Sequence, residues 1–204
     1  HLRLNARQGW LIIDEAFIEA TTQASMVQAD MPPGLIVLHS PGKFFGLAGA
    51  RVGFVFAHDD LLLRIQNLLG PWNVSGPSRF VAQAALLDRD WQAATLARLQ
   101  QDGPRLAQIL HGAKLTPDGG CGLFQWVLTE QAEAIHQHLA QRGILTRLFT
   151  RPHSLRFGLP GSSPEWTRLQ AALADHGIRL LKKTSGIKLR FRSFYSLSLV
   201  FVTT

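Results

Sequence analysis

Cysteine and long apolar runs are scarce in this sequence. Its 204 residues include one cysteine, Cys121, which excludes a disulfide bond within the chain and fits a reducing cytoplasm. No apolar run approaches the roughly 18 residues that a membrane-spanning helix needs, and no charged segment leads into an apolar one as in an export signal. We therefore expect a cytoplasmic location and no membrane partner. A hydrophobic content of 46% is enough to build a core in one or two domains.

The sequence also lacks the residue patterns of two common kinds of active site. It has eight histidines, but no group of them joins Cys121 in a spacing that binds zinc. His136 and His138 lie two residues apart in a predicted helix, so their side chains face different sides. No Gly-x-Ser-x-Gly elbow is present. The sequence therefore supports neither a metal site nor a serine hydrolase.

The net charge of +7 is unevenly distributed along the chain. From residue 182 onward the chain carries five Lys or Arg residues and no acidic residue. We leave residues 181–204 unassigned, because a disordered or strand-like extension, a patch for nucleic acid or a membrane surface, and an altered reading frame all remain open. The preceding body is mildly basic, so no nucleic-acid partner is expected.

One lysine lies in a glycine-rich turn directly after a predicted strand. Residues 35–38 form a short apolar run typical of a buried strand, and the sequence Ser-Pro-Gly ends it just before Lys43. Phe44 and Phe45 follow, so we expect a partly desolvated amine with a lowered pKa, usable as a nucleophile in Schiff-base chemistry. Arg51, eight residues later, could return to the same site and hold an anion. The alternative is that Lys43 and Arg51 are ordinary surface cations beside a turn.

A second apolar run, residues 11–17, carries Asp14 at the end of a predicted strand. A carboxylate in this position must be paired or solvated, so it either caps the next helix or faces a cationic ligand. Asp14 and Lys43 each follow a strand, with residues 18–34 as the crossover between the strands. In a parallel sheet both strand ends open on the edge where α/β proteins bind ligands. We therefore expect Asp14 and Lys43 to form one site.

These segments resemble the signature of fold-type-I pyridoxal-phosphate enzymes. The similarity is carried by residues 11–19 (LIIDEAFIE) and 40–54 (SPGKFFGLAGARVGF), and it continues through residues 71–75 (PWNVS) to residues 154–161 (SLRFGLPG). It is closest to the branch of L-threonine-O-3-phosphate decarboxylases of cobalamin biosynthesis, which is itself similar to histidinol-phosphate aminotransferases. The resemblance covers about residues 1–177.

The resemblance implies a role for each residue of the predicted site. Lys43 would bind pyridoxal 5'-phosphate as a Schiff base and then transfer a proton at the substrate Cα. Asp14 would pair with the pyridine nitrogen of the cofactor, while Ser40 and Arg51 would hold its phosphate. Phe17 stands where many relatives have a tyrosine that donates a hydrogen bond to the phenolic oxygen of the cofactor. The decarboxylase branch commonly has phenylalanine there, which favours decarboxylation over transamination.

Two arginines later in the chain are candidate substrate ligands. Arg156 lies between Leu155 and Phe157 in a predicted strand, where the family places the arginine that binds the substrate carboxylate. Arg147 occupies a position where related enzymes contact the substrate phosphate. A guanidinium group suits both anions because it donates two parallel hydrogen bonds. The alternative for each is an exposed strand cation.

The implied fold class is α/β. We expect the C-terminal part of a pyridoxal-phosphate transferase large domain, with a mostly parallel sheet and helices, in residues 1–80. Interdomain helices and a small α+β domain would follow in residues 81–180. Family members have a further N-terminal portion, with a glycine-rich loop for the cofactor phosphate, that has no match here. The chain, which starts with a histidine, therefore resembles the C-terminal part of such an enzyme.

Local patterns predict the main elements. A helix is expected over residues 59–69, and a long helical pattern starts at Pro77, with a break near Asp88 or at residues 103–104. Strands are expected over residues 121–128, 144–147 and 154–159.

Three functions remain in contention. The first is decarboxylation of L-threonine O-3-phosphate to aminopropanol phosphate by a pyridoxal-phosphate lyase. The second is an aminotransferase for a phosphorylated amino acid such as histidinol phosphate. The third is a catalytically silent chain that acts only as a binding or assembly partner. In the first two cases the partners are a small phosphorylated amino acid and a second copy of the chain in a homodimer.

Overall fold

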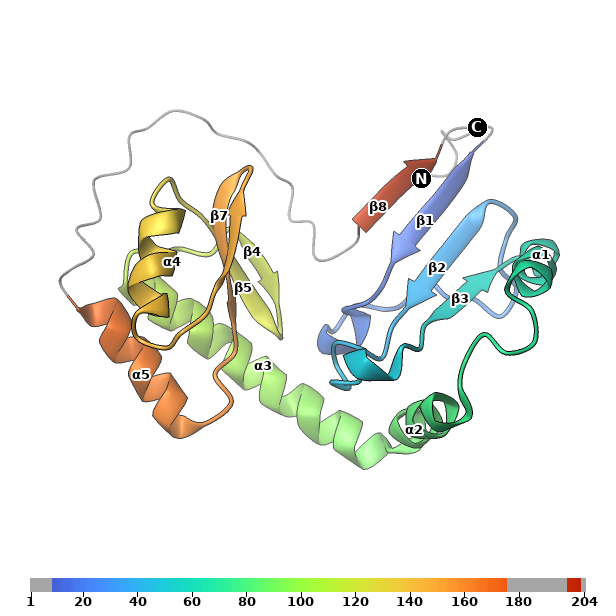
Figure 1. Ribbon diagram of the computed structural model, residues 1–204, viewed down its shortest axis with the longest axis horizontal. Coiled ribbons are helices and arrows are strands. Elements are labelled where there is room, and N and C mark those ends of the chain that lie inside the picture. Colours follow the sequence, from blue (N-terminus) through green and yellow to red (C-terminus); the bar gives the residue numbers. More distant parts are fainter. Residues whose placement is uncertain (1–8, 176–197, 203–204) are drawn as a thin grey trace. The chain divides into compact units, whose positions relative to one another are not determined.

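The computed structural model of the chain describes residues 9–175 and 198–202 (Figure 1). The chain divides into two compact units, one made of His1–Leu96 with Ser196–Thr204 and the other of Ala97–Tyr195. The sequence placed the boundary between residues 80 and 81. It assigned the interdomain helices to residues 81–180 together with the small domain, and the division between the two units falls within one of these helices, α3 (Arg89–Gly112).

The sheet of the first unit is built from four strands: β1 (Trp10–Asp14), β2 (Leu35–His39), β3 (Phe54–Ala57) and β8 (Ser198–Val202). They lie in the order β3-β2-β1-β8 (Figure 1). β1 and β2 are parallel, whereas β3 is antiparallel to β2 and β8 is antiparallel to β1. Among the described strands, parallel pairing is therefore limited to the two that precede the predicted site residues. β8 lies in the segment that the sequence left unassigned, and the rest of that segment is outside the described residues.

Alternating burial explains how the two parallel strands are held. Leu11 and Ile13 of β1, and Leu35 and Val37 of β2, are buried together with Met31 of the crossover. Successive side chains of a strand point to opposite faces, so these residues cover one face of the sheet. The apolar pattern thus fixes the pairing of β1 with β2, and with it the place where both strands end.

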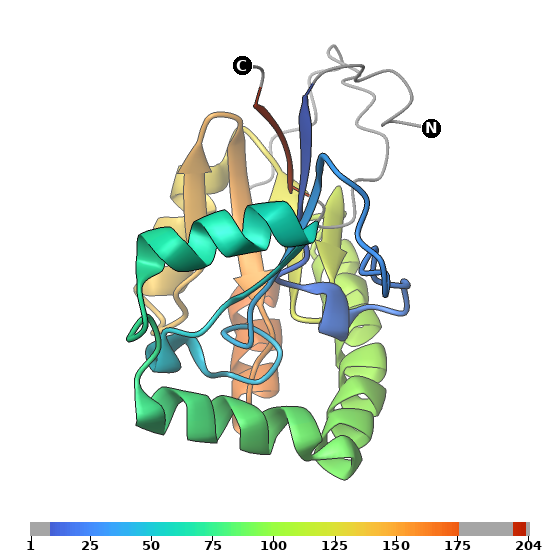
Figure 2. The ribbon, with the colours of Figure 1, turned by 90° about the vertical axis from the view of Figure 1, so that its right-hand side faces the viewer.

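Two helices of the first unit begin at capped residues. α1 (Asp59–Leu69) starts after His58, whose side chain accepts a hydrogen bond from the backbone N–H of Asp60. α2 (Gly76–Leu87) starts after Ser75, whose side chain accepts from the N–H of Ser78. Residues 70–75 connect the two helices (Figure 2). Side-chain acceptors at these positions satisfy N–H groups that the helix leaves unpaired.

The sequence predicts a helix break near Asp88 or at residues 103–104. The structure has the break at Asp88, between α2 and α3, and α3 continues through Gly103 and Pro104. Pro104 has no N–H to donate to the carbonyl of Gln100, four residues earlier in the helix. The carbonyl of Gly103 accepts a hydrogen bond from the side chain of Gln125 at 3.2 Å. A Cβ atom on Gly103 would lie 3.4 Å from Cα of Gly122, so the glycine also allows the helix to approach the neighbouring turn closely.

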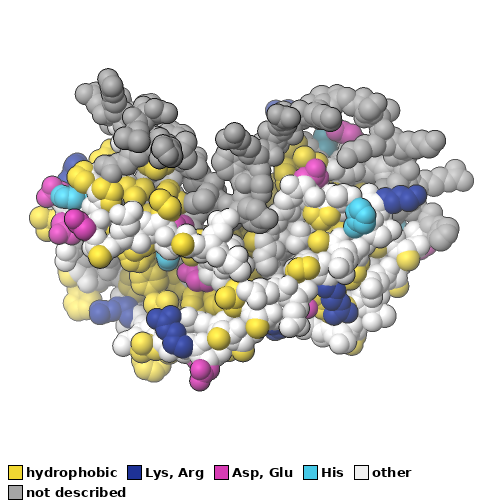
Figure 3. Space-filling view, turned by 180° about the vertical axis from the view of Figure 1, so that it is seen from behind, with side chains coloured by type: hydrophobic (Ala, Val, Ile, Leu, Met, Phe, Trp, Pro, Cys, Tyr) yellow, Lys and Arg dark blue, Asp and Glu magenta, His cyan; other side chains and the backbone are white. Residues whose placement is uncertain are grey.

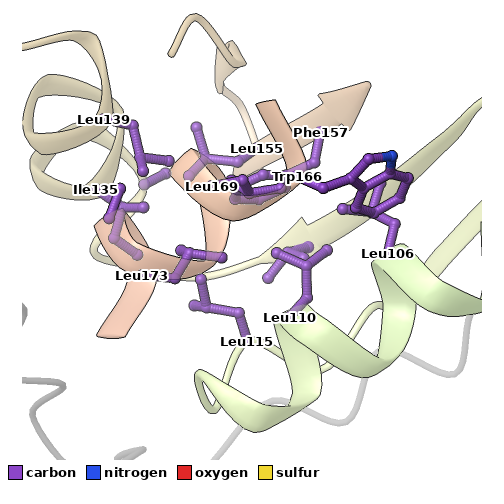
Figure 4. Packing of buried hydrophobic residues seen from close by; sticks show 13 residues of the cluster. Leu106, Leu110, Leu115, Ile135, Leu139, Leu155, Phe157, Trp166, Leu169 and Leu173 are labelled. Carbon is purple, nitrogen blue, oxygen red and sulfur yellow. The ribbon is translucent and has the colours of Figure 1, made fainter. Parts of the chain in front are cut away.

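The second unit combines an antiparallel sheet with helices. Its strands are β4 (Gly119–Cys121), β5 (Phe124–Leu128), β6 (Arg147–Thr150) and β7 (His153–Gly158), in the order β4-β5-β7-β6. α4 (Ala132–Ala140), α5 (Ser163–Ala174) and the end of α3 supply the other side of the core. Figure 4 shows side chains from these elements meeting in the core, among them Leu106, Ile135, Leu155, Phe157 and Trp166.

Two predicted strands of this unit differ from the observed ones. Residues 121–128 were expected to form one strand, but a turn after Cys121 divides them into the hairpin β4–β5. The strand expected at residues 144–147 begins at Arg147, because residues 141–146 complete the connection from α4. Cys121 is buried. No helix within residues 9–175 has the length and apolar character to cross a membrane.

Candidate active site

The two parallel strands deliver the predicted site residues to one edge of the first sheet. Asp14 is the last residue of β1 and pairs in register with Leu38 of β2. His39 ends β2, and Ser40 and Lys43 follow it within the next turn. Lys43 Nζ lies 5.9 Å from the ring centroid of Phe17, three residues beyond Asp14. The segments that carry the lysine and the aspartate therefore lie side by side, as the spacing of the sequence predicts.

Asp14 is held by a local hydrogen bond. Its Oδ1 atom accepts from the backbone N–H of Ala16 at 2.9 Å. An aspartate that bonds its own backbone two residues ahead forms a turn, so β1 ends at this residue. The turn leads into a short 3-10 helix, Ile18–Ala20, rather than into a longer helix that Asp14 would cap.

The lysine turn is compact. The Ser40 hydroxyl accepts from the N–H of Gly42 at 3.2 Å, and the carbonyl of Lys43 accepts from the N–H of Gly46 at 3.1 Å. A Cβ atom on Gly42 would meet Ser40 Oγ at 3.2 Å and Cα of Ala48 at 3.3 Å, so this close approach requires glycine. Gly46 has a φ of +68°, which glycine adopts without strain. The glycine-rich sequence thus folds the loop back on itself around Lys43.

The expected desolvation of Lys43 by its neighbours is wrong for this chain. Phe44 is buried, and its ring meets Trp91 edge-on with centroids 5.6 Å apart, while Phe45 stacks on Trp91 at 5.8 Å. Both aromatic side chains are directed to the start of α3, and Lys43 remains exposed. The apolar neighbours therefore anchor the turn instead of covering the amine.

Arg51 lies at the end of the same loop. It follows a 3-10 helix, Ala48–Ala50, and its Nη1 donates to the carbonyl of Ala48 at 3.1 Å. Its φ of 53° is left-handed, a conformation that costs a residue with a side chain about 1 kcal/mol. The guanidinium is exposed, so it can still be shared with an anion at this loop.

The two candidate substrate arginines lie in the second unit and face each other across a strand pair. Arg147 of β6 is the register partner of Arg156 of β7. Each guanidinium also lies over an aromatic ring, Arg147 over Phe149 at 5.1 Å and Arg156 over Phe124 at 5.2 Å. Burial first, and then the neighbouring Arg147, lower the pKa of Arg156 from its usual value. Two like charges in register repel each other, so this pair favours binding of an anion.

Sequence reasoning missed two residues next to the site. Glu15 was noted only as part of the resemblance, yet it is buried and lies 2.6 Å from the side chain of His39. Trp91 lies far along the chain from the lysine turn that it packs against. An acidic residue at the end of an apolar strand was a visible signal for Glu15, because such a group needs a partner. Nothing local indicated Trp91.

The first unit thus holds an amine and a carboxylate on one sheet edge, and the second unit holds a pair of arginines in register. Residues 2–179 match the model of the family described as aminotransferase class I and II. The chain belongs to the aminotransferase class I and II family. A threonine-phosphate decarboxylase from Pseudomonas aeruginosa is 50% identical over 85% of this chain and 52% of its own length. A threonine-phosphate decarboxylase from a Sinorhizobium species is 40% identical over 84% of this chain and 52% of its own.

Solved aminotransferase-family structures show the same fold. A histidinol-phosphate aminotransferase from Sinorhizobium meliloti, solved in complex with pyridoxal-5'-phosphate, aligns with a TM-score of 0.72 and 24% identity over 80% of this chain and 47% of its own. The L-threonine-O-3-phosphate decarboxylase from Porphyromonas gingivalis aligns with a TM-score of 0.66 and 15% identity over 79% of this chain and 53% of its own. The resemblance and the α/β fold class predicted from the sequence are confirmed. This aminotransferase-family chain spans about half the length of the curated relatives it matches.

Proposed function

We propose that this chain binds pyridoxal 5'-phosphate and takes part in the decarboxylation of L-threonine O-3-phosphate to aminopropanol phosphate, a step of cobalamin biosynthesis. The observation that carries the proposal is the parallel pairing of β1 with β2, which brings the Asp14 turn and the Lys43 turn to one sheet edge. The 50% identity to a threonine-phosphate decarboxylase supports the choice of reaction.

The groups on this edge fit the cofactor chemically. Lys43 offers an exposed amine for the aldehyde, and Asp14 offers a carboxylate for the pyridine nitrogen. Ser40 and Arg51 offer a hydroxyl and a guanidinium for the phosphate, and both belong to the tight loop around Lys43. When bound, the cofactor supplies an electron sink for the bond that breaks at the substrate Cα.

The chain's own residues would then direct the reaction. In the decarboxylation, the bond between Cα and the carboxylate breaks, carbon dioxide leaves, and a proton is delivered to Cα. We assign this proton transfer to Lys43. Phe17, whose ring faces the amine at 5.9 Å, has no hydroxyl to donate to the phenolic oxygen of the cofactor. This residue supports decarboxylation over transamination.

Arg147 and Arg156 are the proposed ligands of the substrate. A phosphorylated amino acid carries a phosphate and a carboxylate, and each suits a guanidinium that donates two parallel hydrogen bonds. The register pairing of the two arginines keeps both groups on one face of the hairpin β6–β7. We assign the carboxylate to Arg156 and the phosphate to Arg147.

Two alternatives have specific support. An aminotransferase for a phosphorylated amino acid is supported by a histidinol-phosphate aminotransferase from Roseiflexus castenholzii, which is 34% identical over 70% of this chain and 40% of its own length. A catalytically silent chain that acts as a binding or assembly partner is supported by the large apolar side chains exposed on α1 and α2, such as Leu68 and Phe80.

We also propose that the chain works in the cytoplasm as a homodimer. Large apolar side chains lie exposed on α1, on the loop after it and on α2, including Leu68, Trp72 and Phe80. Figure 3 shows hydrophobic side chains reaching the surface of the molecule. Exposed apolar patches of this kind mark contact sites in soluble proteins.

Covalent capture of the cofactor tests the proposal. Wild-type chain mixed with pyridoxal 5'-phosphate should become coloured, and borohydride reduction followed by peptide mass spectrometry should place the cofactor on Lys43. Lys43→Ala should abolish the colour, while Lys114→Ala, which removes the lysine after α3 in the second unit, should leave it unchanged. A colourless wild-type chain would favour the silent alternative.

Product analysis separates the two enzymatic alternatives. With L-threonine O-3-phosphate as substrate, release of carbon dioxide without any added keto acid supports the decarboxylase. Turnover that depends on 2-oxoglutarate supports the aminotransferase instead.

Arg156→Met should raise the KM for the substrate about tenfold or more, because it removes a guanidinium that donates two charge-assisted hydrogen bonds.

A further inference from the structure

A hydrogen-bonded pair of side chains, Glu15 and His39, lies at the carboxyl ends of β1 and β2, next to the proposed cofactor residues. His39 Nε2 is 2.6 Å from Oε2 of Glu15, whose side chain is 1% exposed. Glu15 directly follows Asp14, and His39 directly precedes Ser40. Neither Glu15 nor His39 has a role in the binding or proton transfer proposed above.

Glu15 is fully engaged by donors from the crossover segment. The Ser25 hydroxyl donates to its Oε2 atom at 2.6 Å, and the backbone N–H of Met26 donates to its Oε1 atom at 2.7 Å. An ionised carboxylate only accepts hydrogen bonds, so Nε2 of His39 is the donor in the pair. Hydrogen bonds to a buried charge are among the stronger ones in proteins, and losing a partner leaves the charge unpaired.

The imidazole ring of His39 is held from its other sides as well. Its Nδ1 atom lies 3.6 Å from Oε1 of Glu19, in the 3-10 helix after β1. The ring also meets Phe56 of β3 edge-on, with centroids 5.1 Å apart. The side chain therefore contacts the segment that follows β1 on one side and β3 on the other, and it has little freedom to turn.

The pair extends the last backbone link between the two strands. The N–H of Glu15 donates to the carbonyl of Leu38 at 2.8 Å, and beyond this hydrogen bond the segments that follow β1 and β2 separate. The segment after β1 turns at Asp14 toward Phe17, and the segment after β2 enters the loop of Ser40 and Lys43. The hydrogen bond between Glu15 and His39 connects the two segments through their side chains at the point where they separate.

We propose that His39 is a positioning residue that fixes the separation of Asp14 from the lysine loop through its bond to Glu15. This inference rests on the proposed function, because a fixed distance between Asp14 and the lysine loop is useful only if both bind opposite ends of one rigid aromatic cofactor. Groups that bind such a molecule must be held to within about 0.5 Å, and side chains behind them supply that constraint.

The chain itself provides matched variants. His39→Ala removes the donor, whereas His39→Gln keeps an amide N–H near the position of Nε2. Glu15→Gln keeps an acceptor for Met26 but removes the charge, and it serves if His39→Ala does not fold. His58→Ala is the control, since His58 caps α1 and lies 3.5 Å from Asp60. α1 follows β3, which is antiparallel to β2, so His58 lies toward the other edge of the sheet.

Hydrogen exchange without cofactor gives the first readout. His39→Ala and Glu15→Gln should speed amide exchange in peptides covering residues 14–20 and 39–46, the two segments that this hydrogen bond connects. His39→Gln should restore slow exchange. His58→Ala should lower the thermal midpoint through the loss of a helix cap but leave exchange in these two peptides unchanged.

Cofactor affinity gives the second readout. His39→Ala should weaken pyridoxal 5'-phosphate binding about tenfold, which corresponds to about 1.4 kcal/mol, and His39→Gln should recover most of it. In a chain that already carries Asp14→Asn, His39→Ala should weaken cofactor binding less than about threefold. The contact to the pyridine nitrogen that His39 aligns is already weakened in that chain. His58→Ala should bind as the wild type does.

Each result decides the proposal. A folded His39→Ala chain with wild-type exchange at both peptides and wild-type affinity would overturn it, and so would an equal loss of affinity with and without the Asp14 carboxylate. If the wild-type chain takes up no cofactor, the proposed function fails separately. The exchange experiment then decides the positioning role by itself, since it needs no ligand.

Discussion

Glu19 carries a charge that its surroundings support poorly. Its side chain is 24% exposed, and its Oε2 atom is buried without a hydrogen-bond partner among the described residues. Burial raises the pKa of the Glu19 carboxyl, and this effect is larger than the opposing influence of His39. A carboxyl with a raised pKa in the folded chain favours folding while it is protonated and loses that contribution as the pH rises through its pKa.

Glu19→Gln should therefore stabilise the chain at neutral pH. We expect a gain of about 0.5 kcal/mol, a small value because water screens a partly exposed group. The gain should vanish under acidic conditions in which the wild-type carboxyl is also protonated. Thermal unfolding of both chains between about pH 4 and about pH 8 measures this difference.

Glu165→Gln is the matched control, with the opposite sign. The N–H of Gly161 donates to Glu165 at 2.7 Å, and this bond lowers the pKa of an exposed carboxyl. Its contribution is present at neutral pH and is lost as the pH falls, so Glu165→Gln should destabilise slightly at neutral pH. A Glu19→Gln chain that is less stable than wild type at neutral pH would contradict the assigned cost of Glu19.

At the scale of single elements, the hairpin β6–β7 presents two positive charges to the same face. Arg147 is exposed, Arg156 is half-buried, and the two are register partners. Like charges directly opposite each other destabilise a strand pair by a few tenths of a kcal/mol or more. An anion that bridges the guanidinium groups removes this repulsion, so the hairpin should gain stability when phosphate binds.

Arg156→Met should separate the two effects. The free chain should be as stable as wild type or slightly more stable, whereas its affinity for inorganic phosphate should fall about tenfold. Titration calorimetry and thermal shifts with phosphate measure both quantities. Arg151→Met, in the turn of the same hairpin, is the control and should bind phosphate as wild type does. Equal loss in both variants would show that only general positive charge matters.

The elements show which features the sequence can reveal. The apolar runs of β1 and β2, and the breakers after them, were sufficient to predict both strands and the edge shared by Asp14 and Lys43. The helix over residues 59–69 was predicted because its first turn is acidic and Gly70 ends it. These signals are local, since strand and helix periodicity and turn residues depend on near neighbours.

The missed features depend on contacts that are distant in the sequence. Lys43 was expected to be covered by Phe44 and Phe45, but these rings pack against Trp91, and the amine stays exposed. The helix α3 continues through Pro104, and the carbonyl of the adjacent Gly103 accepts a hydrogen bond from Gln125 of β5, 22 residues away in the sequence. The bond between Glu15 and His39 crosses from one strand to the next. No window of neighbouring residues contains both members of such contacts.

At the scale of the whole molecule, exposed apolar side chains gather on consecutive elements of the first unit. Leu68 is 86% exposed in α1, Trp72 is 91% exposed in the following loop, and Phe80 is 73% exposed in α2. Single exposed apolar residues are ordinary in soluble proteins, but large ones on neighbouring segments favour association. Aromatic residues contribute most to such contacts because each buries a large area. A second copy of the chain is the partner proposed for this surface.

Phe80→Glu should shift the chain from dimer to monomer. A buried carboxylate without a partner costs several kcal/mol in an interface, which lowers the association constant at least about a hundredfold. Sedimentation over a range of concentrations measures the change, and Leu145→Glu is the control. Leu145 is 83% exposed in the second unit, after α4, so its replacement should leave association unchanged. A wild-type chain that stays monomeric at every concentration would contradict the homodimer, and equal effects of both variants would place the interface elsewhere.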